Sequence, residues 1–364
     1  MNIDIFNNFY KGKKVLVTGH TGFKGSWLSI WLHELGAEVV GVGLEPYSEK
    51  DNFVLSGIGK KIKADIRADI RDGEKMKEIF KQYKPEIVFH LAAQPLVRLS
   101  YEIPVETYQT NVMGTINIME AIRATESVKV GVMITTDKCY DNKEQMRGYK
   151  EDDPFGGYDP YSSSKGACEI AIQSWRRSFF NPEDYGKKHH VSLASVRAGN
   201  VIGGGDWAKD RIIPDCIRAI EAEKPIEIRS PKAVRPWEHV LEPLSGYLLL
   251  ARKMWECPTD YCEGWNFGPE AESIATVWEV ASQLVQRLGK GELKDASDPH
   301  APHEANLLML DIAKAKTRLG WKPRMDVSRT IDLVADWYQR YRQEDIYGLC
   351  ARQIEQYVEE GLWK

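Results

Sequence analysis

The sequence lacks the features of a disulfide-bonded or zinc-binding protein. Its 364 residues include six cysteines, at positions 139, 168, 216, 257, 262 and 350, and no two of them form a C-x-x-C pair. The eight histidines form no cluster at the spacing of zinc ligands. The sequence therefore predicts no metal site, and it predicts reduced, mostly buried thiols, which are typical of a cytoplasmic protein.

The sequence also lacks an apolar run that approaches the roughly 18 residues needed to cross a membrane. The opening residues, MNIDIFNNFYKGKK, contain no apolar signal core. A formal net charge of −4 provides no general attraction to nucleic acid or to an anionic membrane. We therefore expect a cytoplasmic protein with neither kind of partner.

What the sequence does contain is a regular alternation of strand and helix patterns in its first 200 residues. Buried strands are predicted at 15–19, 38–43, 86–93, 128–136 and 191–200, and helices at 25–36, 74–83, 104–125 and 161–180. This alternation is typical of an α/β fold with a Rossmann-type, doubly wound parallel sheet covered by helices on both faces.

Beyond residue 200 the pattern breaks into Gly- and Pro-rich loops and shorter helices. The chain is long enough for two domains. We expect a dinucleotide-binding domain over residues 1–200, which also takes in about 238–270. We expect residues 201–364 to supply a smaller, mostly helical and discontinuous substrate domain.

The loop after the first strand has the composition of a phosphate-binding turn. Gly19, Gly22 and Gly25 lie between a predicted strand and a predicted helix. Glycine is needed where the turn is tight, where the backbone approaches a pyrophosphate, and where the helix meets the strand. The loop therefore predicts a dinucleotide bound at the helix N-terminus, with a structural turn as the alternative.

Two features of this region are unusual for a dinucleotide site. The acidic residue that commonly holds the adenosine ribose is missing after the second strand, where Gly43 stands with Glu45 just beyond. No arginine stands there to accept a 2′-phosphate, which favours NAD over NADP. His20 and Lys24 within the loop are also unexpected, and surface exposure is the simplest expectation for both.

A further acidic segment, DIRD at 69–72, offers a short side chain to an adenine. An overlapping D-I-R copy begins at Asp65, so the register is open, and both copies could be solvated charge.

Tyr161 and Lys165 are four residues apart and therefore share one face of a predicted helix. A phenolate at neutral pH requires the tyrosine pKa to fall by about three units, roughly 4 kcal/mol. A lysine and a positive nicotinamide ring can together supply that shift. Tyr10 and Lys14 have the same spacing, but only the later pair begins a helix whose preceding strand opens on the cofactor crevice.

That preceding strand ends in Thr135-Thr136-Asp137-Lys138. A carboxylate beside an amine at the open end of a strand is a candidate for proton transfer, and a local salt bridge is the alternative.

These motifs together resemble the extended branch of the short-chain dehydrogenase/reductase superfamily, and within it the nucleotide-sugar 4,6-dehydratases that act on CDP-glucose. The matching segments are GHTGFKG (19–25), DIRD (69–72), HLAA (90–93), TNVMGT (110–115), TTDK (135–138), YSSSK (161–165), RAGNVIGGGDW (197–207) and RPWEHVLEP (235–243). They follow the family order over at least the first 240 residues.

The resemblance implies a bound NAD and a set of contacts. The implied cofactor contacts are Gly19, Thr21, Gly22, Phe23, Lys24, Gly25, Asp69, Ile70, Leu91, Ala92, Ala93, Asn111, Tyr161 and Lys165. The implied contacts with the nucleotide-sugar are Ser100, Thr136, Asn200, Arg211, Arg235 and His303. Of these, Arg235 is a good candidate for the diphosphate because a guanidinium meets phosphate bidentately.

The implied reaction removes water from CDP-glucose, a step in deoxysugar and O-antigen precursor synthesis. Tyr161, assisted by Lys165, takes the proton of the C4 hydroxyl while a hydride moves from C4 to NAD+, and Thr136 bonds the C4 oxygen. Asp137 protonates the hydroxyl that leaves C6. The hydride then returns to C6, so the cofactor is regenerated in each turnover.

Lys138 departs from the dTDP-glucose dehydratases, which carry Thr-Asp-Glu with the glutamate as the base at C5. A lysine acts as a base only when it is neutral. We expect Lys138 to be the C5 base, and the alternative is that it positions the intermediate.

Other functions remain open at this point. A 4,6-dehydratase for a dTDP-, GDP- or UDP-sugar, a nucleotide-sugar 4-epimerase and a non-catalytic dinucleotide sensor would share the fold. Residues 137–138 favour dehydration, since epimerases usually carry small hydroxyl residues there. Family members pair through helices equivalent to 104–125 and 161–180, which implies a homodimer or a dimer of dimers.

Overall fold

The computed structural model describes residues 4–145, 147–270, 273–297 and 308–360. A seven-stranded sheet in the order β10-β6-β5-β4-β1-β2-β3 runs through these residues, and all its strand pairs are parallel. The strands are β1 (Lys14–Thr18), β2 (Glu38–Gly43), β3 (Ala64–Arg67), β4 (Ile87–His90), β5 (Val130–Ile134), β6 (Ser192–Ala198) and β10 (Gly264–Phe267). The predicted Rossmann-type sheet is confirmed.

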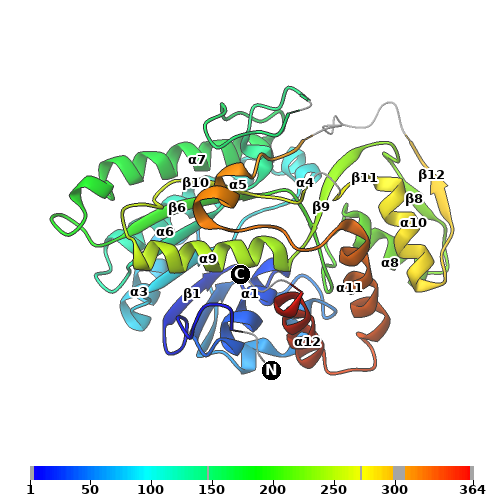
Figure 1. Ribbon diagram of the computed structural model, residues 1–364, viewed down its shortest axis with the longest axis horizontal. Helices are drawn as coiled ribbons and strands as arrows, with labels where there is room; N and C mark the ends of the chain where they lie inside the picture. Colours follow the sequence, from blue (N-terminus) through cyan, green and yellow to red (C-terminus); the bar gives the residue numbers. More distant parts are fainter. Residues whose placement is uncertain (1–3, 146, 271–272, 298–307, 361–364) are drawn as a thin grey trace.

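Helices cover both faces of this sheet (Figure 1). On one face lie α3 (Gly73–Tyr83), α6 (Gly114–Arg123) and α7 (Pro160–Ser178); on the other lie α1 (Phe23–Glu34) and α9 (Leu241–Glu256). Successive side chains of a strand point to opposite faces. In β1, Leu16 packs with the first group and Val15 and Val17 pack with the second. Burial on both sides explains the unbroken apolar runs of the sequence.

The smaller elements lie beyond the carboxyl end of β6, at the right of Figure 1. A three-stranded sheet has the order β11-β9-β7, and β8 pairs with β12. These strands are β7 (Asn200–Ile202), β8 (Ile226–Ile228), β9 (Val234–His239), β11 (Ile274–Thr276) and β12 (Leu293–Asp295). Their helices are α8 (Ile212–Glu221), α10 (Val277–Leu288) and α11 (Val327–Arg340), and α12 (Ile346–Glu359) packs against α1. The division into two domains stays a proposal.

Two local predictions differ from the structure. Strand β3 was not predicted, because its sequence ADIR is short, charged and half exposed, as is common in an edge strand. The single helix predicted at 104–125 is three segments: α5 (Pro104–Tyr108), a π-helical turn (Gln109–Met113) and α6. Such a turn inside a helix is frequent near functional sites, and this one contains Asn111. Two further short helices are α2 (Asn52–Ser56) and α4 (Val97–Glu102).

Glu242, in the first turn of α9, ties that helix to the C-terminal segment. Its Oε1 accepts hydrogen bonds from the backbone N–H groups of Arg324 (2.8 Å) and Met325 (2.7 Å), and its Oε2 accepts one from the Tyr357 hydroxyl (2.8 Å). The glutamate is only 1% exposed. Its loss therefore leaves buried donors without an acceptor, which is more costly than losing an exposed hydrogen bond.

We expect Glu242→Ala to lower the free energy of unfolding by about 2–4 kcal/mol, because three donors lose their acceptor. Urea unfolding measures this change. Glu256→Ala is the matched control, since Glu256 lies at the exposed end of the same helix and forms an ion pair with Arg252 (2.7 Å). The free energy of unfolding of this control should fall by no more than about 0.5 kcal/mol. Equal losses in both variants would contradict the role of Glu242.

Candidate active site

A cavity of about 990 Å³ opens at the carboxyl end of the main sheet and extends between the loops of β1, β4, β5 and β6 and the smaller sheets. Most residues predicted for the site line it. They are Gly19, Thr21, Gly22, Phe23, Lys24, Gly25, Asp69, Ile70, Leu91, Ala92, Ala93, Thr136, Asp137, Lys138, Tyr161, Lys165, Asn200, Arg211 and Arg235. Their individual roles stay predictions, but the structure brings them to one cavity.

Three glycines lie between the end of β1 and the first turn of α1, and at two of them no other residue fits. Gly19 has φ +74°, and a Cβ there would lie 2.8 Å from the backbone nitrogen of Ala92. A Cβ on Gly25 would lie 2.1 Å from the carbonyl oxygen of Gly19. The first turn of α1 carries no acidic residue, and no side chain caps it. Its free N–H groups therefore face the cavity with the geometry that suits a pyrophosphate.

His20 is fully buried, so the expectation that it is exposed on the surface is wrong. Its Nε2 hydrogen-bonds with Asp65 (2.7 Å), and its ring occupies the space above β2, where a Cβ on Gly41 would lie 2.2 Å from the ring. Burial lowers the pKa of His20 despite the bond to Asp65. In the sequence, this close packing is indicated by glycine at alternate positions of β2, Gly41 and Gly43. The pattern can be interpreted once the pairing of the strands is known.

Lys24 is half-buried in the cavity wall, so surface exposure is also wrong for this residue. Burial lowers its pKa to about 8, against the attraction of Glu238. Glu238, on β9, is 1% exposed, and neither of its carboxyl oxygens has a hydrogen-bond partner among the described residues. Burial raises the pKa of Glu238, with Lys24 opposing the rise. Lys24, in the first turn of α1, is therefore electrostatically linked to the buried Glu238.

At the opposite side of the loop, β2 and β3 end beside Asp69. Gly43 pairs in register with Arg67, the arginine of the D-I-R copy that begins at Asp65, and the sequence analysis did not place this arginine beside Gly43. The Arg67 guanidinium is held by Asp65 and by Glu45 (3.2 Å), and Asp69 is held by Arg71 (2.9 Å). The missed strand β3 is the reason that Arg67 was overlooked.

The catalytic candidates meet where β5 ends and α7 begins. Asp159 caps α7 by accepting a hydrogen bond from the backbone N–H of Ser162 (2.9 Å), and Pro160 fits the first helical position. This cap places Tyr161 against Thr136, whose hydroxyl donates to Asp137 (2.8 Å). The site therefore joins a phenol, a hydroxyl and a carboxyl in one buried group.

The electrostatics of this group suit an acid more readily than a base. Burial raises the pKa of Asp137, against the charge of Lys138 and the bond from Thr136. A carboxyl group with a raised pKa is protonated over a wider pH range and can donate its proton. Burial also raises the pKa of Tyr161, against its hydrogen bond with Thr136. Ionisation of this phenol therefore requires further positive charge.

The two lysines of the group differ in their surroundings. Lys165 is buried on α7, donates to the carbonyl of Ile134 (3.4 Å), and has a pKa that burial lowers. Lys138 is half-buried in the short helix Asp137–Cys139 and lines the cavity.

Two predicted contacts, Ser100 and Asn111, do not line the cavity. Ser100 is fully buried behind the cavity wall, where its hydroxyl accepts a hydrogen bond from the backbone N–H of Tyr161 (3.1 Å). Asn111 is also buried, and its amide bonds Gln94 and the Ser164 hydroxyl (2.9 Å). Both residues support the start of α7 in this geometry instead of lining the cavity. His303 lies outside the described residues.

The far end of the cavity carries the predicted diphosphate residues. Arg211 is paired with Asp206 (2.7 Å), and Arg235 lies on β9 next to the buried Trp237. Beyond them the wall includes Arg229 and Ser230, which the sequence analysis did not single out because no short motif marks them.

Two classes of feature are absent from the described part of the chain. No helix in it is both long and apolar enough to serve as a membrane span. No group of histidine, cysteine, aspartate and glutamate side chains in it is arranged to hold a metal ion.

Comparisons with known proteins extend over nearly the whole chain. The chain is 49% identical to CDP-glucose 4,6-dehydratase of Salmonella typhimurium over 355 residues, which span 97% of this chain and 98% of that protein. Two solved structures share the fold at lower identity. dTDP-glucose 4,6-dehydratase from Bacillus anthracis, in complex with NAD, is 20% identical with a TM-score of 0.73 and covers 90% of this chain and 97% of its own. UDP-glucose 4-epimerase from Thermus thermophilus, in complex with NAD, is 24% identical with a TM-score of 0.74, covering 89% and 98%.

The sequence profile described as GDP-mannose 4,6 dehydratase matches residues 16–334. That match includes the glycine loop, the residues at the ends of β5 and β6 and the start of α7. The chain therefore belongs to the GDP-mannose 4,6 dehydratase family, in agreement with the resemblance that its motifs carry.

Proposed function

We propose that the chain is a hydro-lyase that converts CDP-glucose to CDP-4-dehydro-6-deoxyglucose with NAD as its cofactor. The observation that carries this proposal is the buried acid Asp137 beside Thr136 and Tyr161, next to a dinucleotide cradle. The 49% identity to a CDP-glucose 4,6-dehydratase supports the choice of nucleotide. By the same relationship, the product is a deoxysugar precursor of the kind used in O-antigen synthesis.

The residues of the β1–α1 loop fit a dinucleotide. Gly19 and Gly25 leave no space for a side chain, and the uncapped N-terminus of α1 offers N–H donors to a pyrophosphate. When bound, NAD supplies a hydride acceptor for C4 and a hydride donor for C6, so that the net reaction is the loss of one water. The positive nicotinamide ring is also the charge that the Tyr161 phenol needs.

Side chains of the protein then carry out the individual proton transfers. Tyr161 takes the proton of the C4 hydroxyl, and Thr136 hydrogen-bonds the C4 oxygen. Lys138 removes the proton at C5, which the new C4 ketone makes acidic, and later returns a proton there. Asp137 gives its proton to the hydroxyl that leaves C6, and this hydroxyl departs as water.

Asp137 distinguishes this proposal from a 4-epimerase of the same fold. Epimerisation at C4 requires no acid for a C6 hydroxyl, so a buried carboxyl with a raised pKa at this position favours elimination. A sensor without activity has no need of the capped and buried Tyr161 at all.

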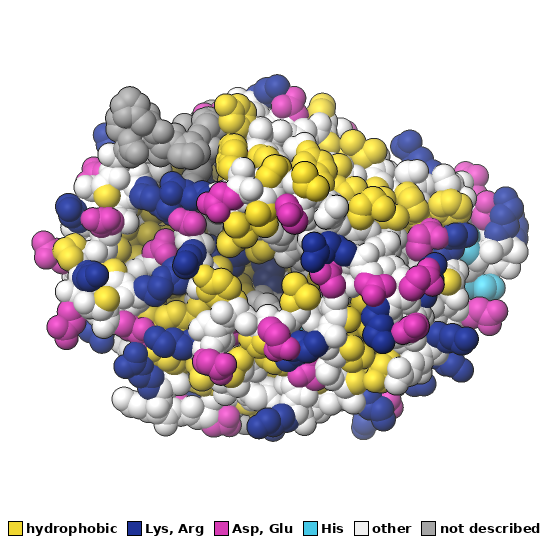
Figure 2. All heavy atoms as spheres, turned by 180° about the vertical axis from the view of Figure 1, so that it is seen from behind, with side chains coloured by type: hydrophobic (Ala, Val, Ile, Leu, Met, Phe, Trp, Pro, Cys, Tyr) yellow, Lys and Arg dark blue, Asp and Glu magenta, His cyan; other side chains and the backbone are white. Residues whose placement is uncertain are grey.

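We also propose that the chain is cytoplasmic and forms a homodimer, which can pair further into a dimer of dimers. All six cysteines are free and five of them are buried, which suits a reducing compartment. Large apolar side chains are exposed on α4, α5, the π-helical turn and α7 and just after α7, at Tyr101, Val105, Tyr108, Met113, Ile170 and Phe179. Figure 2 shows hydrophobic side chains gathered in a band on the α7 side of the molecule. Such a band is typical of a subunit interface.

Incubation of the protein with NAD and each of CDP-, dTDP-, GDP- and UDP-glucose tests the main proposal by mass spectrometry. We expect a product lighter by one water from CDP-glucose, and a rate at least a hundredfold lower for Tyr161→Phe because the base is lost. Tyr83→Phe, on α3 far from the cavity, is the matched control. Turnover without a change of mass identifies an epimerase, and absence of turnover with bound NAD identifies a sensor.

Lys138→Met tests the base at C5. We expect it to abolish the exchange of the C5 hydrogen with solvent deuterium, because methionine has a similar length but no basic nitrogen. Lys150→Met, on the exposed part of the following loop, should leave exchange unchanged. Retained exchange in Lys138→Met assigns the proton transfer to another group.

Ile170→Asp tests the interface, because a carboxylate on this 60% exposed position of α7 would be buried against a second copy. We expect the dimer to dissociate at micromolar concentrations in sedimentation velocity. Lys290→Asp, after α10, is the control and should leave the sedimenting species a dimer. A dimer that survives Ile170→Asp places the interface on another surface.

A further inference from the structure

A buried ion pair lies directly behind the cavity, between α7 and β6. The Arg197 guanidinium donates through Nε to Glu169 Oε1 (2.9 Å) and through Nη2 to Oε2 (2.9 Å). The two side chains are 1% and 0% exposed, and neither lines the cavity. A pair of this kind contributes little to stability by itself, because the cost of burying two charges offsets their attraction. The role of the Glu169–Arg197 pair is therefore to position the segments that it contacts.

Glu169 holds the end of β5. The Thr135 hydroxyl donates to Glu169 Oε1 and also lies 3.2 Å from the carbonyl of Val196, while the Ser195 hydroxyl donates to Oε2 (2.7 Å). Burial would raise the pKa of Glu169, but Arg197 and these hydroxyls outweigh it and lower the pKa. The carboxylate therefore stays charged and accepts a bond from the residue immediately before Thr136 and Asp137.

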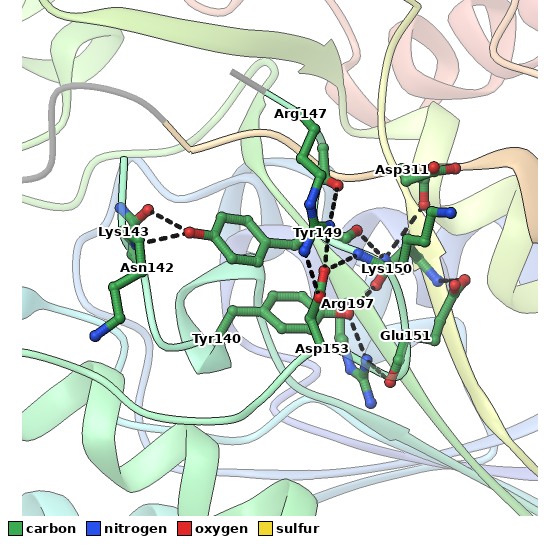
Figure 3. A network of polar contacts seen from close by, with 12 residues as sticks. Tyr140, Asn142, Lys143, Arg147, Tyr149, Lys150, Glu151, Asp153, Arg197 and Asp311 are labelled. Carbon is green, nitrogen blue, oxygen red and sulfur yellow. Dashed lines mark hydrogen bonds and ion pairs between the residues drawn. The ribbon is translucent and has the colours of Figure 1, made fainter. Parts of the chain in front are cut away.

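Arg197 holds the segment that follows the catalytic residues (Figure 3). Its Nη1 donates to the Tyr140 hydroxyl and to the carbonyl of Glu151 (3.1 Å). The guanidinium also lies against two neighbouring rings, 5.1 Å from the centre of the Tyr140 ring and 4.9 Å from that of the Phe155 ring. Tyr140 in turn donates to Asn266 on β10 (2.8 Å).

Residues 135–140 are thus held at both ends by the same ion pair, through Thr135 at one end and Tyr140 at the other. Asp137 and Lys138 lie between these two anchors. Glu169 belongs to α7, one turn beyond Lys165, so the pair connects this segment to the helix that carries Tyr161.

We propose that Glu169 and Arg197 are positioning residues that keep Asp137 and Lys138 in register with Tyr161, so that elimination follows C4 oxidation without release of the ketone. The inference rests on the proposed function, because it concerns the order of two steps of that reaction. Tyr161 and Lys165 have anchors of their own in the Asp159 cap and the Ile134 carbonyl. Loosening residues 135–140 weakens the contact of Thr136 with Tyr161 but leaves the helix cap that positions Tyr161, whereas it displaces Asp137 and Lys138 themselves, so elimination is impaired more than oxidation.

Thr135→Val and Ser195→Ala form a matched pair of tests. Each removes one hydroxyl from the same carboxylate, but only Thr135 is joined to the catalytic segment. Thr135→Ser restores the hydroxyl and serves as the rescue. The three variants and the parent protein are compared with CDP-glucose and NAD by rapid quench, with separate mass measurement of the 4-keto hexose nucleotide and of the dehydrated product. Thermal midpoints verify that every variant is folded.

For Thr135→Val we expect elimination to slow by about tenfold or more, since misplacement of a catalytic group by a fraction of an ångström has effects of this size. The 4-keto hexose should accumulate and C5 deuterium exchange should fall, while KM stays within about twofold. Ser195→Ala and Thr135→Ser should turn over as the parent does.

Two outcomes overturn the inference. Equal behaviour of Thr135→Val and Ser195→Ala shows that the hydroxyls matter only to packing. A slow Thr135→Val that accumulates no ketone places the defect before elimination. Failure of the parent protein to act on any nucleotide-sugar is a different result, since it removes the proposed function itself.

Arg197→Lys provides a second test that keeps the charge but replaces the planar fork with a single ammonium. Lysine can still neutralise Glu169, yet its single nitrogen cannot reproduce the two parallel bonds to Glu169 together with the bond to Tyr140. Accumulation of the ketone in this variant supports the inference, and turnover equal to that of the parent contradicts it.

Discussion

The burial of charge is the constraint on which this active site depends. A charged group transferred from water to a protein interior is unfavourable unless other groups compensate it. In this chain, Glu169 is compensated by an arginine and two hydroxyls, and its carboxylate stays ionised. Asp137 has only a hydroxyl and nearby positive charges, and its pKa rises. Two carboxyl groups a short distance apart thus serve different purposes because their surroundings differ.

The parallel sheet makes this arrangement possible. All seven strands of the main sheet run in one direction, so their carboxyl ends meet at one edge, together with the loops that follow them. The β1 loop brings the glycine cradle to that edge and β5 brings Thr136 and Asp137. Strand β9 pairs antiparallel with β11 and parallel with β7. This small sheet closes the other side of the cavity, to which β9 contributes Arg235. The chemistry is divided among segments that are distant in sequence.

The local parts of this design were predictable from the sequence, and the long-range parts were not. The glycine loop and the Tyr161–Lys165 spacing depend on one turn and one helix, which short patterns describe well. His20 was misjudged because its burial depends on Gly41 and Asp65, which only the strand pairing brings beside it. Ser100 and Asn111 were assigned to ligands because the family resemblance implied it, whereas their polar atoms are bonded to the protein around α7. Strand β3 was too short and too charged to be recognised.

The position of β10 has a consequence for the order in which the molecule is completed. This strand follows α9 in the chain, yet it pairs with β6 at the end of the main sheet, through Trp265 opposite Val196. A polypeptide that stops near residue 200 would keep the pairing of β6 with β5 but would leave the other edge of β6 unpaired, and an unpaired apolar edge is a ready template for aggregation. During synthesis on the ribosome, the main sheet therefore stays unfinished until the chain has been made as far as Phe267, the last residue of β10.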